Sequence, residues 1–112
     1  VTTMDDKDAI KRMRQGQFVA NNGRVLRIIN LLRHKYERLQ DVKYAIPGIP
    51  EDRFLDSINF LDAAGYIKLR HVTTREELHL EDADDYTDLE AKVTATGIRL
   101  LGGEIHDRMV DA

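Results

Sequence analysis

Apolar residues follow a helical rhythm between Arg24 and Tyr36. They recur at spacings of three and four residues, as on one broad helix face: Val25, Leu26, Ile28, Ile29, Leu31, Leu32 and Tyr36. Basic residues hold other positions of this segment and one just beyond it: Arg24, Arg27, Arg33, Lys35 and Arg38. The pattern predicts an amphipathic helix over residues 24–36 that carries a basic face.

The preceding segment, residues 3–20, is polar with few apolar positions. We expect it to form a separate helix from about Asp5, with Thr3 as its N-cap, because threonine oxygens accept hydrogen bonds from unpaired amides there. The run Asn21-Asn22-Gly23 is expected to end this helix, since such residues favour turns.

Two more helices and two strands are predicted downstream. A short helix over 39–46 is ended by a turn with both prolines, and a second helix over 51–64 buries Phe54, Ile58 and Leu61 and stops at Gly65. Residues 66–70 and 89–93 alternate between apolar and polar, which indicates a β-hairpin with a long tip. Thr94 or Thr96 then caps a short final helix that ends at Gly102.

Two motifs in this order carry a family resemblance. In the first motif, residues 61–67, Leu61 is followed by Gly65-Tyr66-Ile67. In the second, residues 93–101, the end of a strand at Val93 is followed by Thr94, Thr96 and Gly97 at the start of a helix. The chain resembles winged helix-turn-helix proteins over about residues 23–103, and it is similar to small proteins of Mu-like phages and prophages. The resemblance implies a mainly α fold with a small antiparallel hairpin, in which a three-helix core carries one wing.

The same resemblance divides the chain into three parts. Residues 1–22 form an N-terminal helical extension, residues 23–103 the winged-helix domain with its short final helix, and residues 104–112 a C-terminal tail. Winged-helix regulators commonly dimerise through flanking segments, so the extension and the tail are candidate dimer contacts. The apolar residues left over after the core is assigned are candidate partner contacts: Ile10, Met13, Phe18, Leu55 and Phe60. The alternative is that these residues pack on their own domain.

Composition narrows the class of protein. The chain has 112 residues, 42% hydrophobic and 33% charged, which suits one domain with one core. The absence of cysteine excludes disulfides, thiol catalysis and cysteine-bound zinc. No apolar run approaches the ~20 residues that span a bilayer, and no signal-peptide pattern opens the chain. We therefore expect a cytoplasmic protein.

No pattern of a catalytic or cofactor site is found. Ser57, the only serine, lacks a glycine-flanked turn, and no two histidines stand four residues apart on a helix. The acidic run at residues 82–88 lacks the central glycine and the full alternation of a calcium loop, so we expect a solvated, mobile loop tip there. The sequence predicts no enzymatic activity, no cofactor and no bound metal.

The net charge of −3 is unevenly distributed. Residues 1–50 hold ten Lys/Arg against five Asp/Glu, and residues 51–112 hold seven against fifteen. In winged-helix proteins the third helix enters the major groove, so Arg53 and Asn59 are candidate base readers, and the basic face of residues 24–38 is a candidate phosphate contact. The alternative for that face is a solvated surface that balances the acidic wing. Asp52 and Asp56 on the third helix and the acids of the wing oppose a polyanion.

Two functions are compatible with these features, and the sequence favours the first. The first is a phage-type transcriptional regulator that binds double-stranded DNA as a homodimer, without catalysis. The second is an acidic winged-helix interaction module that binds a basic protein partner and no DNA. A continuous negative surface over the third helix and the wing favours the second, and a positive groove favours the first.

Overall fold

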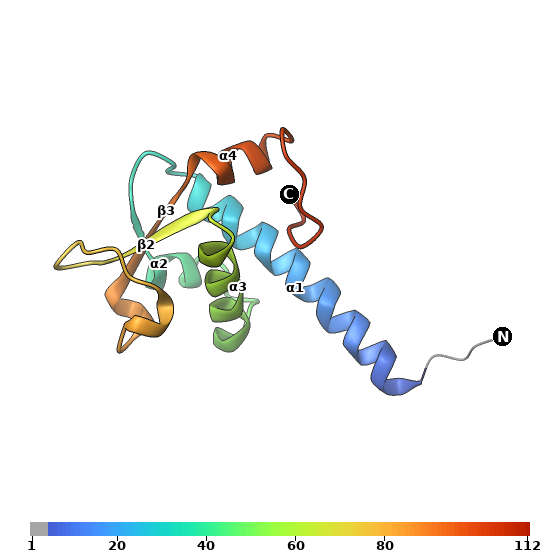
Figure 1. Ribbon diagram of the computed structural model, residues 1–112. Helices are drawn as coiled ribbons and strands as arrows, with labels where there is room; N and C mark the ends of the chain where they lie inside the picture. The colour runs from blue at the N-terminus through green and yellow to red at the C-terminus, as the bar shows by residue number, and fades with distance from the viewer. Residues whose placement is uncertain (1–4) are drawn as a thin grey trace.

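A computed structural model describes residues 5–112. The fold is mainly helical with one small antiparallel sheet, as predicted (Figure 1). The helices are α1 Asp6–Asn30, α2 Leu39–Tyr44, α3 Glu51–Ala63 and α4 Ala95–Leu101, and the strands are β1 Glu37–Arg38, β2 Ile67–His71 and β3 Leu89–Val93. Two 3-10 turns, η1 Leu80–Asp82 and η2 Tyr86–Asp88, lie between β2 and β3.

The sheet has the strand order β1-β3-β2. In the β2–β3 pair Ile67 lies opposite Val93 and Leu69 opposite Ala91, so the alternate side chains that the sequence pattern marked as apolar all face the core. Both of these strands were predicted, β3 with its observed bounds. The strand β1 was not predicted, because two residues are too few to show an alternation.

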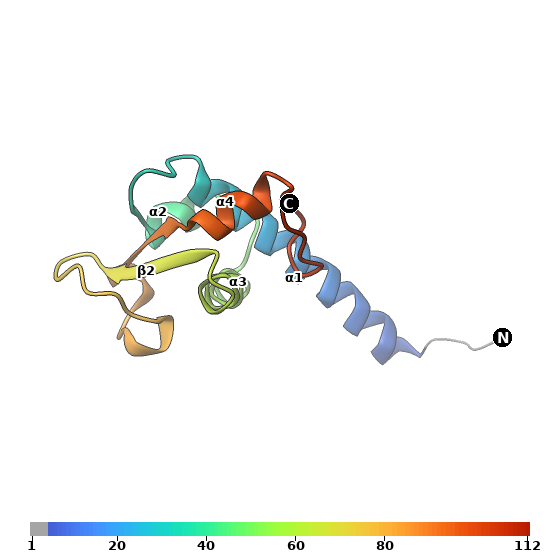
Figure 2. The same ribbon diagram turned by 45° about the horizontal axis from the view of Figure 1, so that its top comes forward.

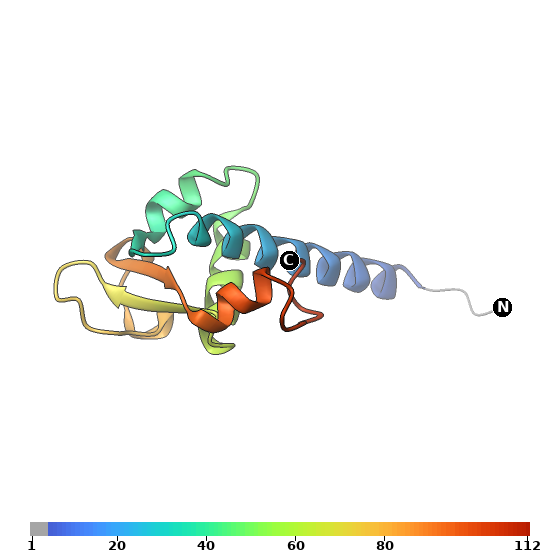
Figure 3. The ribbon, with the colours of Figure 1, turned by 90° about the horizontal axis from the view of Figure 1, so that it is seen from above.

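The core fills the space between the sheet and the helices. Its fully buried side chains come from every layer: Val25, Leu26, Ile29, Leu39, Phe54, Ile58, Leu61, Ile67 and Leu89. The second half of α1 packs along α3 and also contacts β3 and α4. Figures 2 and 3 show α4 running beside α1, while the first half of α1 projects away from the domain.

The two sequence motifs meet where α3 joins the sheet and β3 joins α4. Gly65 ends α3 at φ +82°, a conformation that glycine adopts without strain. The Thr94 hydroxyl caps α4 by accepting from the Gly97 amide (3.1 Å), and it donates to the Gly65 carbonyl (2.6 Å). A Cβ at Gly97 would lie 2.3 Å from the Tyr66 carbonyl oxygen, so only glycine permits this close approach. The junction holds α3, the sheet and α4 together.

The predicted break at residues 21–23 is wrong, because α1 is one continuous helix. Asn22 and Gly23 are buried under the C-terminal tail instead of forming a turn. Glycine in a helix costs about 1 kcal/mol relative to alanine, a penalty that tertiary contacts can override. Asp5 caps the helix by accepting from the Asp8 amide (2.8 Å), whereas Thr3 lies outside the described residues. The predicted boundary between residues 22 and 23 therefore falls within a helix.

The C-terminal tail, residues 104–112, packs on its own domain. Asn22 Nδ2 donates to the Met109 carbonyl (2.8 Å), Arg27 Nη1 donates to the Asp111 carbonyl (2.6 Å), and Val110 is buried. The Tyr66 hydroxyl donates to Asp107 Oδ2 (2.5 Å), and burial together with this bond raises the pKa of Tyr66 to about 12. A Cβ at Gly23 would lie 1.8 Å from the Asp111 carbonyl oxygen, so the tail crosses α1 where the helix lacks a side chain.

The C-terminal end of α1 also differs from the prediction. The helix ends at Asn30 and not at Tyr36, and residues 31–36 form a turn that leads into β1. The guanidinium carbon of Arg70 lies 3.6 Å from the centroid of the Tyr36 ring. Arg70 Nε also pairs with Glu90 Oε1 of β3 at 2.5 Å. This cation–π contact draws Tyr36 to the sheet. Leu31 and Leu32, predicted on the apolar face of the helix, are left 73% and 39% exposed.

The acidic run predicted as a solvated, mobile loop tip, residues 82–88, has exposed acids at Asp82, Asp84 and Asp85, but its segment is anchored to the domain. The chain turns at residues 72–75, then runs back beside β2, where the Leu78 amide donates to the Leu69 carbonyl (3.1 Å). Apolar side chains spaced among the acids pack against the core: Leu78, Leu80, Ala83 and Tyr86. These side chains hold residues 78–88 against the helices.

The contact between Gly23 and the tail predicts opposite effects of one substitution at two helical glycines. Gly16→Ala is expected to raise the free energy of unfolding by up to about 1 kcal/mol, since a Cβ there meets nothing within 4 Å. Gly23→Ala is expected to lower it by about 1–3 kcal/mol by forcing the tail off the helix. Urea unfolding measures both. Equal stabilisation by the two substitutions would contradict the described tail packing.

Candidate interaction surfaces

Helix α3 has an acidic outer face. The predicted stripe is buried, as expected: Phe54, Ile58 and Leu61. Ser57, which was not part of that stripe, is buried as well. The solvent-facing positions are Glu51, Asp52, Asp56, Asn59 and Ala63. The helix has no basic residue in its last turn, and its two first-turn acids suit the positive end of the helix dipole.

Both candidate base readers lie on this helix. Asn59 is exposed on the acidic side, and Arg53 is partly buried at its flank. Arg53 Nε lies 3.9 Å from Asp52 Oδ2, a solvent-exposed ion pair that contributes little to stability. Their neighbours are therefore carboxylates, and their role as base readers stays a prediction.

Residues 79–88 extend the acidic surface of α3, because they pack directly against that helix. His79 Nδ1 lies 2.7 Å from Asp62 Oδ2, and the Tyr86 ring meets Phe54 edge-on with centroids 6.1 Å apart. We call the exposed carboxylates of these two segments the acidic face: Glu51, Asp52, Asp56, Glu81, Asp82, Asp84 and Asp85. Figure 1 shows the two segments on the same side of the molecule.

The anchors of residues 79–88 shift two pKa values. The hydrogen bond and charge of Asp62 raise the pKa of His79, and the nearby Asp82 and Glu81 add to that effect. Burial raises the pKa of Tyr86, and a hydrogen bond and the charge of Glu51 raise it further. The neutral tyrosine and a protonated His79 are thus the forms that the surrounding carboxylates favour.

The predicted basic face does not form one helix surface. Arg24 and Arg27 lie on α1, Arg33 and Lys35 lie in the turn after it, and Arg38 lies on β1. All five are exposed, and Arg27 also donates a hydrogen bond to the tail. In Figures 1 and 2 the turn at residues 31–36 lies on the opposite side of the domain from α3 and residues 79–88. The structure therefore does not bring Arg53 and Asn59 together with this turn.

The five predicted partner-contact residues separate into two groups. Phe18 and Phe60 pack edge-on against each other with centroids 5.5 Å apart, and Leu55 and Phe60 pack on the core, so these three serve their own domain. Ile10 and Met13 are 44% and 59% exposed on the projecting half of α1. Of the five, only this second pair is largely exposed, and its role as a partner contact stays a prediction.

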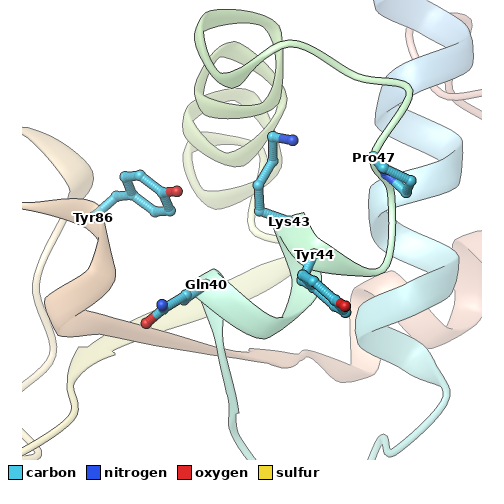
Figure 4. Close-up of a pocket in the computed structure, with 5 residues that line it drawn as sticks. All are labelled: Gln40, Lys43, Tyr44, Pro47 and Tyr86. Atoms are coloured by element: carbon cyan, nitrogen blue, oxygen red, sulfur yellow. The ribbon is translucent and has the colours of Figure 1, made fainter.

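An open groove that the sequence did not predict lies between α2 and η2 (Figure 4). Its volume is about 600 Å³, and its lining residues are Gln40, Lys43, Tyr44, Pro47 and Tyr86. Tyr44 is 87% exposed. A signal was present in the sequence: Leu39, Val42 and Ile46 point inward, which leaves Tyr44 as an aromatic residue on the outer side of the short helix.

Comparison of the chain with protein-family models, curated proteins and solved structures finds no match in any of the three. Within residues 5–112 no helix is long and apolar enough to cross a membrane. No group of three or more His, Asp or Glu side chains in this part of the chain is arranged to hold a metal ion.

The ion pair between His79 and Asp62 predicts a pH-dependent anchor. Because the folded pKa of His79 is raised, its stabilising effect is full below the unfolded pKa of about 6.5 and is lost as pH rises through the folded pKa. An NMR titration should show the raised pKa, and Asp62→Asn should bring it back towards 6.5. Amide exchange of residues 79–83 should be faster in that variant. An unchanged His79 pKa in Asp62→Asn would refute the anchor.

Proposed function

We propose that this chain is a non-catalytic interaction domain of winged-helix architecture that binds a basic protein partner through its acidic face. The observation that carries the proposal is the packing of residues 79–88 against α3, which gathers seven exposed carboxylates on one side.

The order of elements supports the winged-helix assignment. A helix, a strand, two helices and two strands follow one another, and the segment between the last two strands occupies the position of a wing. The junction of Thr94 with Gly65 gives a physical reason for the two motifs on which the resemblance rests. Relation to phage proteins stays a prediction from the sequence.

The charge of the acidic face favours a protein over a nucleic acid. DNA affinity depends on the neutralisation of phosphates by Lys and Arg. A helix with Asp52 and Asp56 facing outward would repel the phosphates of a duplex. The same carboxylates attract a basic patch and accelerate its association. The contacts of His79 and Tyr86 restrain the segment that carries these acids, so the entropic cost of ordering it when a partner binds is smaller.

DNA binding is the second candidate, on one observation. Arg33, Lys35 and Arg38 are exposed near one another in the chain and form no ion pair within the described residues. In this candidate the turn at residues 31–36 contacts phosphates, and α3 faces away from the duplex. Such binding would lack base readout by Arg53 or Asn59.

Fluorescence anisotropy with two labelled probes tests the proposal: an oligolysine peptide, and a duplex of random sequence at low salt. We expect salt-dependent peptide binding that Asp52→Asn/Asp56→Asn weakens about 2–10-fold, as loss of two surface charge contacts implies. The control Asp6→Asn/Asp8→Asn makes the same change in net charge far from the acidic face and should leave affinity within about twofold.

Three outcomes decide between the candidates. Equal weakening by the two double variants would contradict a defined acidic face. Duplex binding that Arg33→Glu/Lys35→Glu abolishes would establish the second candidate. Duplex binding that Arg53→Ala/Asn59→Ala weakens would restore base reading by α3.

A further inference from the structure

We propose that copies of this chain associate head to tail, with the turn at residues 31–36 of one copy seated in the groove at Tyr44 of the next. The inference rests on the proposed function in one respect, because the groove borders the acidic face.

The turn combines apolar and basic side chains at the surface. Leu31 and Leu32 are 73% and 39% exposed, and Arg33, His34 and Lys35 beside them are also exposed. The leucines continue the apolar face of α1 beyond its end, and within residues 5–112 both remain exposed. Adjacent exposed leucines followed in the chain by Arg33 and Lys35 are suited to an apolar site with carboxylates nearby.

The groove at Tyr44 has the complementary character. Tyr44 and Pro47 on one side and Tyr86 on the other provide apolar surface, and Figure 4 shows the Lys43 side chain between the two tyrosines. Burial raises the pKa of Tyr86, and so do the charges of Glu51 and Asp85, which supply negative charge on the Tyr86 side of the groove. Lys43 extends towards α3. Leucines can thus contact the rings while Arg33 and Lys35 approach these carboxylates.

The occupant is a second copy because both halves of the contact belong to this chain. The turn lies between α1 and β1, and the groove lies between α2 and η2, so one molecule offers two different surfaces. A contact between unlike surfaces is heterologous and extends into rings or open chains. Two leucines and one groove form a small interface, so we expect a dissociation constant on the order of 100 µM.

Two variants, each lacking one half of the contact, test the proposal. Leu31→Ser/Leu32→Ser removes the apolar turn, and Tyr44→Ser opens the groove; all three side chains are exposed, so both variants should fold, which circular dichroism checks. Sedimentation velocity should show concentration-dependent association of the wild type that weakens with salt. Each variant alone should be monomeric. Their equimolar mixture should form a dimer, because one retains the turn and the other the groove.

Ile10→Ser/Met13→Ser is the matched control, as it removes two other exposed apolar residues and should leave association unchanged. A wild type that stays monomeric at millimolar concentration, self-association of either variant, or a mixture that stays monomeric would each overturn the proposal. Loss of association in the control would place the contact on α1 instead. Oligolysine binding by a monomeric wild type would reject the head-to-tail contact while leaving the proposed function intact.

Discussion

Phe54 occupies the position on which the arrangement of this molecule depends. Its side chain is fully buried where α3 packs against the core, and its ring also packs against Tyr86, in the segment between β2 and β3, in a T-shaped arrangement. With Ile58 and Leu61 it sets the rotation of α3, and this rotation turns Asp52 and Asp56 to solvent. The same contact holds the acidic segment beside the helix. One apolar site therefore orders a charged surface.

The separation of charge follows from these packing requirements. Acidic residues gather around α3 and residues 79–88, whereas exposed basic residues of the turn at 31–36 lie on the other side of the domain. A groove-reading helix needs positive charge beside it, so the arrangement suits a protein partner better than a duplex. The turn also carries two exposed leucines, and the groove at Tyr44 carries exposed aromatic surface near carboxylates. These are the two surfaces that the proposed head-to-tail contact joins.

Much of the architecture follows from local patterns. The stripe on α3, the alternation of β2 and β3, the glycine that ends α3 and the threonine that caps α4 depend on neighbours in sequence, and these features match the structure closely. The outward direction of Asp52, Asp56 and Asn59 follows from the same helical period. The groove was missed because it joins a two-turn helix to a residue of a distant loop.

Contacts between distant segments determine the features of α1 that local sequence patterns predicted wrongly. Asn21-Asn22-Gly23 reads as a helix break, but the tail covers Asn22 and fills the space that a side chain at Gly23 would occupy, so α1 continues. Tyr36 is held at the sheet by Arg70, which pairs with Glu90. The apolar pattern of α1 therefore continues beyond the last helical residue, and Leu31 and Leu32 remain exposed. The sequence by itself determined which residues favour helix, strand and core, because those preferences are local. Tertiary structure decided where α1 ends, where the acidic segment lies and which apolar residues remain at the surface, because these depend on partners far apart in the chain.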